Sequence, residues 1–481
     1  MLLAAAPAAI VTPAPSGAAW SASAVAVLRR DLDALLAGKG LRGAHVGVYA
    51  IDAASCTPLY ARDANDEFQP ASTLKLLVGS AALERLGPDY RFGTSAELRT
   101  GPEGDYARAV VVAGGDPFLD AAALDDLVAS LKQTKIVPRL GWGIDASRYD
   151  AQSYPEGWSW DDLAEDYAAP VSAMTFEENV VHLTLTPAAD EGAPPSIGAA
   201  PIPYAAPVER MCNSWSPVVV DAVTGPPGGE STLDVSRAPF ACTVVTGSIP
   251  RGARPESVDA AVIRPVDYAM SYLYQETKRA GILPAPDPPL VGQPAPQPAQ
   301  RFWAHASAPM REWLGPRFWI PSDNLVAELL LKELGFVAGG KPGTTGKGIA
   351  FEKSWLHGIG VDPATTTLAD GSGLSQYDRI TPRDLVAILT HDWNGPNRDL
   401  VLASLPVGGA RGTIEGIAGT DAAGRVFAKT GSMSHVRGLA GYLAPLHHGA
   451  VIFAFSVDDW IGEYKALAAV RAAVLSRIVD D

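Results

Sequence analysis

A serine and a lysine three residues apart form the first pair in this chain that could do covalent chemistry. They are Ser72 and Lys75 in the string STLK, which follows Pro70 and opens a predicted helix ended by Gly87. A serine hydroxyl is a weak nucleophile and needs an adjacent base. Residues i and i+3 of a helix share one face, and burial could lower the pKa of Lys75 enough for it to take the serine proton. An isolated S-x-x-K is more often ordinary helix surface.

A second polar string, Ser322-Asp323-Asn324, stands just before a predicted helix over residues 324–334 that Gly335 would stop. A hydroxyl in this place could relay a proton to a leaving amine, and an amide could hold a substrate peptide bond. Serine, aspartate and asparagine are also the preferred helix N-caps. Both roles can coexist, with Asp323 or Ser322 capping the helix while the other residues act in a site.

The third string, Lys429-Thr430-Gly431, ends a predicted strand, RVFAKTG. A cation and a hydroxyl here can bind a substrate carboxylate, and Gly431 would let the substrate backbone lie close against the strand. Taken alone, K-T-G is usually a strand running into a turn. The three strings in this order are much more specific than any one of them.

With S-x-x-K, S-D-N and K-T-G in order, the chain resembles the D-alanyl-D-alanine carboxypeptidases of the low-molecular-mass class C penicillin-binding proteins, which also act as DD-endopeptidases. Further similar strings are GGDPFL (114–119), APVSAMTFEENVV (169–181), DGSGLS (370–375) and GGARGT (408–413). The resemblance implies an α/β (α+β) serine β-lactamase/DD-peptidase-like transpeptidase fold. An antiparallel sheet would be flanked by helices, and a large, mostly β insertion would fill the long gap between the first two motifs.

The resemblance also implies roles in acylation. Ser72 would be the acylated nucleophile and Lys75 its base, and Ser322 would pass a proton to the leaving D-alanine. The natural substrates would be peptidoglycan stem peptides ending in D-Ala-D-Ala. β-Lactam inhibitors would acylate the same serine and leave slowly. Neither a cofactor nor a metal is expected.

The remaining implied roles concern substrate binding. Asn324 would orient the substrate, and Lys429 with Thr430 would engage its terminal carboxylate. The backbone N–H groups of Ser72 and Ser432 would form an oxyanion hole, in which each donor is typically worth about 3–4 kcal/mol. Ser432 stands where the family more often has threonine, a mild change because only the backbone would act.

Two other functions compete with a DD-peptidase. A β-lactamase is disfavoured by the insertion and because no obvious deacylating glutamate motif lies between Asn324 and Lys429. A non-catalytic protein that binds D-Ala-D-Ala in the cell wall is disfavoured by the intact Ser72 and Lys75. The sequence leaves open whether carboxypeptidase or endopeptidase action dominates.

Composition narrows the class of protein further. The 481 residues are 47% hydrophobic, which allows two or three folded units, and the net charge of −15 argues against a nucleic-acid partner. No run of about 20 apolar residues suggests a transmembrane helix. Residues 1–24 are apolar, uncharged and rich in small side chains, so we expect a signal peptide or leader, although a basic n-region is missing. Export to the periplasm or to the cell wall and exterior is expected.

The expected domains are the leader (1–24), a catalytic domain (25–93 plus 301–481) and an inserted region (94–300) of two subdomains. Within the insertion we predict short strands, and proline excludes regular structure from residues 283–300. In an exported protein Cys212 and Cys242 could form a bridge, leaving Cys56 free. Residues 339–348 are predicted as a flexible loop, and Trp158 and Trp160 as core.

Overall fold

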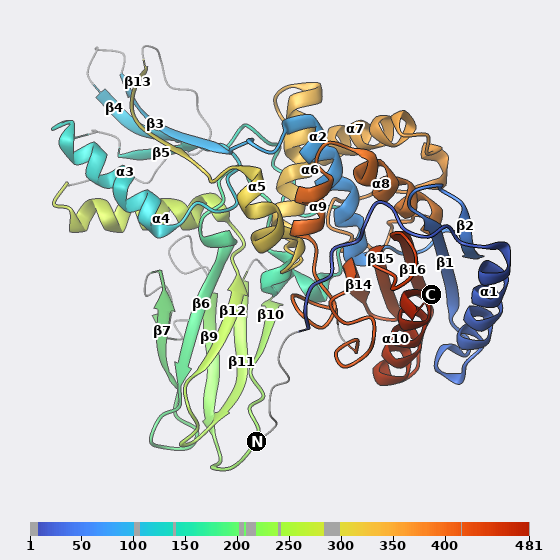
Figure 1. Cartoon of the computed structure of the whole chain (residues 1–481). Coiled ribbons are helices and arrows are strands. Elements are labelled where there is room, and N and C mark those ends of the chain that lie inside the picture. Colours follow the sequence, from blue (N-terminus) through green and yellow to red (C-terminus); the bar gives the residue numbers. More distant parts are fainter. Residues whose placement is uncertain are drawn as a thin grey trace. The chain divides into compact units, whose positions relative to one another are not determined.

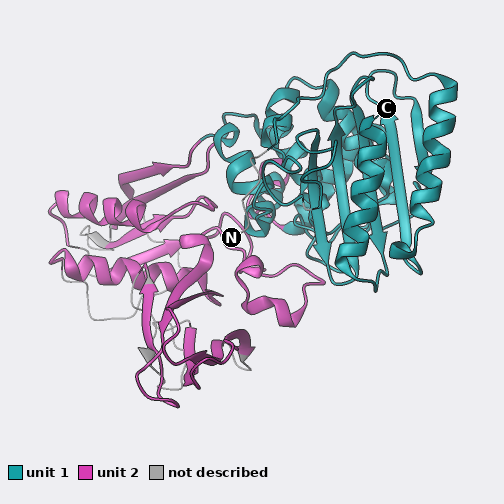
Figure 2. Ribbon diagram, turned by 60° about the horizontal axis from the view of Figure 1, so that its bottom comes forward, with its two compact units in different colours: residues 1–90, 309–335, 345–481 teal, residues 91–308, 336–344 magenta. Residues whose placement is uncertain are grey.

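The computed structural model describes residues 8–100, 106–137, 141–201, 206–207, 218–238, 242–282, 299–414 and 416–480. They form two compact units (Figures 1 and 2). Unit 1 comprises residues 1–90, 309–335 and 345–481, and unit 2 comprises residues 91–308 and 336–344. Each of the three sequence strings with catalytic potential lies in unit 1.

Unit 1 is built around one five-stranded sheet in the order β14-β15-β16-β1-β2, in which every neighbouring pair is antiparallel. The strands are β1 (His45–Asp52), β2 (Pro58–Arg62), β14 (Val426–Met433), β15 (Val436–Leu443) and β16 (Val451–Asp458). The sheet therefore joins the N-terminal and C-terminal parts of the chain, because β1 pairs with β16 along its whole length.

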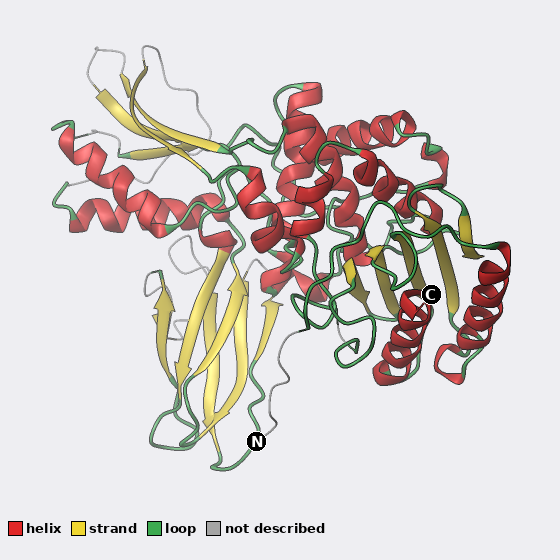
Figure 3. Cartoon of the chain, viewed as in Figure 1, coloured by secondary structure: helices red, strands yellow, loops and turns green. Residues whose placement is uncertain are grey.

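Helices surround this sheet (Figure 3). They are α1 (Ala22–Leu36), α2 (Lys75–Leu86), α5 (Met310–Trp313), α6 (Asn324–Gly339), α7 (Thr345–Gly358), α8 (Pro382–Asn394), α9 (Arg398–Ser404) and α10 (Tyr464–Asp480). Alternate strand residues such as Phe453 and Phe455 pack with α1 and α10 in the main apolar core. Helix α8 contacts β1, β15 and β16 and also α2.

Strand alternation decides which side of β14 faces the catalytic strings. Val426 and Ala428 belong to the core cluster with α1 and α10. Because successive side chains of a strand point to opposite faces, Lys429 and Gly431 are directed to the other face. On that face the turn Ala71–Leu74 packs against β14 and β15.

The described residues of unit 2 form three sheets and, between residues 91 and 308, two α-helices. One sheet has the order β13-β3-β4-β5, another β12-β6-β7 and the third β10-β11-β9-β8. The elements are β3 (Gly93–Thr100), β4 (Tyr106–Val112), α3 (Ala121–Gln133), β5 (Trp142–Asp145), β6 (Val180–Thr186), β7 (Ser196–Ala200), β8 (Ala206–Pro207), β9 (Val218–Gly225), β10 (Asp234–Ala238), β11 (Cys242–Pro250), β12 (Glu256–Ala261), α4 (Pro265–Arg279) and β13 (Ala299–Ala306). Helix α3 connects the parallel neighbours β4 and β5.

The expected fold class, an antiparallel sheet flanked by helices with a largely β extra region, is confirmed. Three local predictions were wrong. Helix α6 continues through Gly335 to Gly339 and ends before Gly340, whose positive φ of 71° suits a glycine after a helix. Residues 345–348 begin helix α7 instead of continuing a loop. Trp160 is 59% exposed and so is not a core residue.

Some predictions fall partly outside the described residues. This holds for the Cys212–Cys242 pair and for residues 283–298 of the proline-rich segment, whereas residues 299 and 300 already belong to β13. Cys56 is an exposed free thiol.

The described part of the expected leader lies along unit 1. The Val11 N–H donates to the Gly424 carbonyl at 2.9 Å, and the Trp20 ring stacks on His448 with centroids 4.0 Å apart. Ser21 caps α1, its side chain accepting a hydrogen bond from the Ala24 N–H at 3.1 Å. Of the helices formed by described residues, none is long and apolar enough to cross a membrane.

Candidate active site

Ser72 lies in a tight turn immediately before α2. The turn, Ala71–Leu74, is a 3₁₀ helix, and Lys75 is the first residue of α2. In a 3₁₀ helix, residues i and i+3 are eclipsed, so the side chains of Ser72 and Lys75 stand together. Ala71 has a φ of 44°, a left-handed conformation that costs a non-glycine residue energy and is concentrated at functional sites.

The Lys75 ammonium is completely buried and has three hydrogen-bond acceptors around it. Its Nζ lies 2.8 Å from Ser72 Oγ, 2.5 Å from Asn324 Oδ1 and 2.8 Å from the carbonyl oxygen of Ser372. An ammonium carries three protons, so these contacts use all of its donors. The lysine is thereby held in one place against the serine hydroxyl.

Burial controls the basicity of Lys75. Loss of water around the charged form lowers the pKa of Lys75 to about 8, against the opposing effect of the carboxylates Asp370, Asp323 and Glu328. A substantial fraction of this lysine is therefore a neutral amine near neutral and mildly alkaline pH. That is the form able to accept a proton from Ser72.

A second serine–lysine pair stands beside the first. The Lys429 Nζ donates to Ser322 Oγ at 2.8 Å and to the Thr430 carbonyl at 2.9 Å. Burial, and then the nearby charge of Lys75, lower the pKa of Lys429 well below its usual value. Ser322 itself has a φ of 68°, the second left-handed non-glycine residue in the site.

The Ser322-Asp323-Asn324 string divides its work among its members. Asp323 Oδ1 accepts a hydrogen bond from the N–H of Val326 at 2.9 Å and so caps helix α6. Ser322 contacts Lys429, and Asn324 contacts Lys75. The alternative that the sequence left open is thus resolved: Asp323 is the cap, and its neighbours face the two lysines.

Gly431 is required by packing against the nucleophile turn. A Cβ at Gly431 would lie 2.6 Å from the Pro70 carbonyl oxygen and 3.2 Å from the Ser72 nitrogen. The sequence suggested that Gly431 leaves room for a substrate. The structure gives a further reason for a glycine here, because the nucleophile turn already lies close against it. Thr430 Oγ1 is 2.6 Å from Thr413 Oγ1, and Ser432 is exposed at the end of this strand.

Sequence reasoning missed several groups at this site. Ser372 contributes its main-chain carbonyl, which no side-chain pattern reveals, although it lies in the DGSGLS string. Thr413 lies in GGARGT and contacts Thr430. The indole N–H of the buried Trp319 donates to the Lys75 carbonyl at 3.0 Å. The strings that contain Ser372 and Thr413 were noted only for their similarity to the family. No sequence pattern pointed to Trp319.

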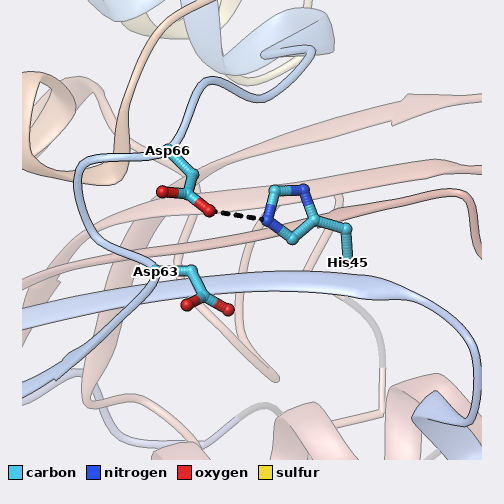
Figure 4. Close-up of side chains that lie close together, drawn as sticks. All are labelled: His45, Asp63 and Asp66. Carbon is cyan, nitrogen blue, oxygen red and sulfur yellow. Dashed lines mark hydrogen bonds and ion pairs between the residues drawn. The ribbon is translucent and has the colours of Figure 1, made fainter.

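A group of potential metal ligands lies elsewhere in unit 1. His45, Asp63 and Asp66 approach one another near β1 and β2 (Figure 4), with His45 Nε2 3.1 Å from Asp66 Oδ2. The His45 ring also stacks on Phe68, with centroids 4.2 Å apart. Both aspartates are exposed, so this arrangement is that of an ordinary surface ion pair, and we assign it no role.

Comparison with known proteins identifies the family of this chain. The model of the D-Ala-D-Ala carboxypeptidase 3 (S13) family matches residues 28–477. The chain belongs to this family. A D-alanyl-D-alanine carboxypeptidase of Actinomadura sp. is 34% identical over 98% of this chain and 88% of its own length. The D-alanyl-D-alanine carboxypeptidase DacB of Haemophilus influenzae is 27% identical over 81% of this chain and 80% of its own.

Solved structures show the same fold. The crystal structure of penicillin binding protein 4 (dacB) from Haemophilus influenzae superposes with a TM-score of 0.80 at 23% identity, covering 94% of this chain and 99% of the other. The crystal structure of the same penicillin binding protein 4 complexed with a β-lactam superposes with a TM-score of 0.75 at 22% identity, covering 94% of this chain. The expected family, a serine-type peptidase family of hydrolases, is confirmed by the family match and by the Actinomadura relative.

Proposed function

We propose that this S13 family member is a serine DD-peptidase that cleaves peptidoglycan stem peptides ending in D-Ala-D-Ala through an acyl-enzyme on Ser72. The observation that carries the proposal is the 2.8 Å contact between Lys75 Nζ and Ser72 Oγ in a buried site. The relatives named as D-alanyl-D-alanine carboxypeptidases support the substrate class.

The first step is activation of the serine. A protonated Lys75 donates to Ser72, Asn324 and the Ser372 carbonyl. After losing one proton, the amine keeps two N–H donors for the amide and carbonyl oxygens and offers its lone pair to the Ser72 hydroxyl. The serine oxygen then attacks the carbonyl of the penultimate D-alanine while its proton passes to Lys75.

The second step is expulsion of the leaving group. The developing oxyanion would accept hydrogen bonds from the backbone N–H groups of Ser72 and Ser432. Ser322, held by Lys429, would relay to the departing amine of D-alanine the proton that Lys75 took from Ser72, so that the serine and the lysine both return to their starting forms. Water then hydrolyses the ester on Ser72 and regenerates the free serine.

The remaining motif residues would bind the substrate. Asn324 would hold its peptide bond, and the terminal carboxylate would lie against Lys429 and Thr430 in the middle of β14, which continues to Met433. An arriving carboxylate favours the charged form of a lysine, which compensates for the lowered pKa of Lys429. Gly431 keeps this strand against the nucleophile turn.

A cross-link between stem peptides also joins a D-alanine carbonyl to an amine, so the same steps would give endopeptidase activity. β-Lactams would acylate Ser72 in place of the substrate, in keeping with the β-lactam complex of the structurally similar penicillin binding protein 4. Because the substrate lies outside the cytoplasmic membrane, we propose export, with residues 1–24 serving as the leader.

Intact-mass spectrometry after incubation with benzylpenicillin tests the nucleophile. We expect wild type and Ser434→Ala, a control in the exposed turn after β14, to gain one drug mass, and Ser72→Ala to gain none. Release of D-alanine from a synthetic peptide ending in D-Ala-D-Ala should show the same pattern. An adduct on Ser72→Ala would place the nucleophile elsewhere, and rapid consumption of penicillin without an adduct would indicate a β-lactamase.

A further inference from the structure

The third partner of Lys75 is a main-chain oxygen on a loop. The loop comprises residues 370–375, the DGSGLS string, and the carbonyl of Ser372 lies 2.8 Å from Lys75 Nζ. Since a carbonyl oxygen moves only with its backbone, the position of Lys75 depends on whatever holds this loop. Substitution of the Ser372 side chain would not remove this contact.

Helix α6 holds the loop through Glu328. Its Oε1 accepts hydrogen bonds from the N–H groups of Gly371 at 3.0 Å and Ser372 at 2.8 Å. Glu328 is completely buried, in a helix whose neighbouring side chains are mostly leucine and valine. Burying a carboxylate is costly unless hydrogen bonds compensate, and here two backbone donors to Oε1 do so in part, while the buried Oε2 has no partner among the described residues.

The loop is also fastened at its other side. The Asp370 carboxylate accepts the N–H groups of Gly373 and Ser375, both at 2.7 Å. A Cβ at Gly373 would lie 1.9 Å from the carbonyl oxygen of Ala71, so the loop packs directly on the nucleophile turn. A shift of the loop would therefore disturb both the base and the turn that carries Ser72.

Asn324 and Glu328 are four residues apart on α6 and so share one face of that helix. Asn324 contacts Lys75 directly, whereas Glu328 contacts it through the Ser372 carbonyl. The start of α6 thus holds the lysine by two routes. The sequence motif includes the first of these residues and omits the second.

We propose that Glu328 is a positioning residue for acylation: by binding the N–H groups of Gly371 and Ser372, it fixes the Ser372 carbonyl against Lys75 and so aligns this base with the Ser72 hydroxyl. The inference rests on the proposed function, because it concerns the same acyl transfer. It adds a residue to which none of the three motifs assigns a role.

Electrostatics provides a readout that a purely structural role would not move. Burial and the charge of Asp370 raise the pKa of Glu328 to about 8, the range in which Lys75 titrates. A charged Glu328 raises the pKa of Lys75. Other charged groups that act on the pair are Asp323 before α6, Asp370 and Asp378 at the loop, Glu352 on α7 and Lys429 on β14, and the buried Lys332 is four residues after Glu328 on α6.

Three variants separate the contributions. Glu328→Gln keeps an oxygen acceptor for the two N–H groups but removes the charge. Glu328→Leu removes the acceptor at similar volume. Glu352→Gln is the matched control, because Glu352 is as deeply buried among the same carboxyl groups while the N–H groups of Gly371 and Ser372 bond to Glu328.

The measurements are the benzylpenicillin acylation rate constant and the pre-covalent dissociation constant between pH 6 and 9.5, with thermal denaturation to verify folding. We expect Glu328→Leu to acylate about 100-fold more slowly with little change in pre-covalent binding, since small misplacements of reacting groups cost about this much. Glu328→Gln should retain most of the rate at pH 9, and its rate should level off at a lower pH than that of wild type, because wild-type Glu328 becomes charged, and so raises the pKa of Lys75, only as the pH approaches 8. Glu352→Gln should stay within about threefold of wild type.

Folded Glu328→Leu that acylates at the wild-type rate would overturn the proposal. Should that variant fail to fold, Glu328→Gln decides, and a rate that levels off at the same pH as in wild type would then overturn it. If wild type itself forms no penicillin adduct, the proposed function fails together with this inference. Normal acylation of wild type beside unaffected variants defeats the positioning role alone.

Discussion

The two units differ in how many charged side chains they bury. Among the described residues of unit 2, Asp116 is the one charged side chain that is buried. Unit 1 buries a dozen, distributed over α2, α6, α7, α8, α10, β1, β14 and the loops beside them: Asp52, Lys75, Glu328, Lys332, Glu333, Glu352, Asp370, Asp378, Asp384, Asp392, Lys429 and Arg471. Because burying a charged group without partners costs desolvation free energy, unit 1 has a destabilising contribution that is much smaller in the described part of unit 2.

This difference separates a framework from a reaction centre. Apolar packing and backbone ladders suffice to build the sheets of unit 2. A nucleophile with a tuned base needs desolvation to lower a lysine pKa and fixed acceptors to hold that lysine. Some of the buried charged groups of unit 1 serve this purpose: burial lowers the pKa values of Lys75 and Lys429, and Asp370 and Glu328 act on Lys75.

Replacing the base should have the largest effect. Lys75→Met keeps an unbranched apolar stem but removes the amine that contacts Ser72. We expect the benzylpenicillin acylation rate constant to fall by about 10³ or more, the size associated with loss of a catalytic base. Lys465→Met, at an exposed position of α10, is the control and should match wild type. Rapid acylation of Lys75→Met would mean that another group activates the serine.

The next effect is the pH dependence of the wild-type reaction. Only neutral Lys75 can take the Ser72 proton, and burial lowers its pKa to about 8. The acylation rate should therefore rise about tenfold per pH unit in the acidic range and level off above pH 8. Stopped-flow measurements from pH 6 to 9.5 would show this. A rate constant that is flat across that range would contradict a lysine base in this environment.

Asp392, a buried carboxyl on α8, which packs against α2, should affect the free energy of unfolding instead of the acylation rate. Asp392 accepts a hydrogen bond from Ser80 Oγ at 2.6 Å, and burial raises the pKa of Asp392 to about 7. The folded protein thus holds a proton that the unfolded chain releases near pH 4. Stability should fall as pH rises from about 4 to about 7, by about 1.4 kcal/mol per pH unit from this group, and then stay level.

Asp392→Asn tests this contribution, because the amide retains an acceptor for Ser80 but does not titrate. We expect the variant to be more stable than wild type at pH 8, by about 1–3 kcal/mol, and similar at pH 4. Urea unfolding at the two pH values provides the measurement, with the exposed Asp399→Asn as control. Equal stabilities of Asp392→Asn and wild type at pH 8 would show that the carboxyl is not strongly perturbed.

The smallest effect concerns the exception in unit 2. Asp116 Oδ1 accepts the Phe118 N–H at 3.0 Å, and its other oxygen lies 3.6 Å from His305 Nε2. Asp116→Asn should lower the free energy of unfolding by about 1–2 kcal/mol and leave the acylation rate unchanged. Urea unfolding and acylation kinetics together check this. Slower acylation at unchanged stability would break the distinction between the two units.

Local spacing made part of the site predictable. Ser72 and Lys75 are close because one turn of helical backbone separates them, and that holds wherever the turn packs. The capping preference of Asp323 is likewise local, and so is the alternation that directs Lys429 and Gly431 to one face of β14. The antiparallel sheet flanked by helices could be expected because the motifs resembled those of a known family.

The remainder depends on contacts between distant segments. Nothing near Glu328 in the sequence indicates that its carboxylate meets backbone N–H groups more than forty residues further on. The continuation of α6 through Gly335 reflects packing, since Gly335 is buried and tertiary contacts override a weak local preference. Helices α3 and α4 were missed because the short β-like runs around them dominated the pattern of the middle section.

The pairing of β1 with β16 affects how the protein folds during its synthesis on the ribosome. During synthesis β1 is made early, whereas its neighbour β16 is made only after the long stretch of chain that lies between them. Contacts this distant in sequence form slowly. The reactive serine is therefore made long before β14 and β15, the strands against which its turn packs in the folded protein.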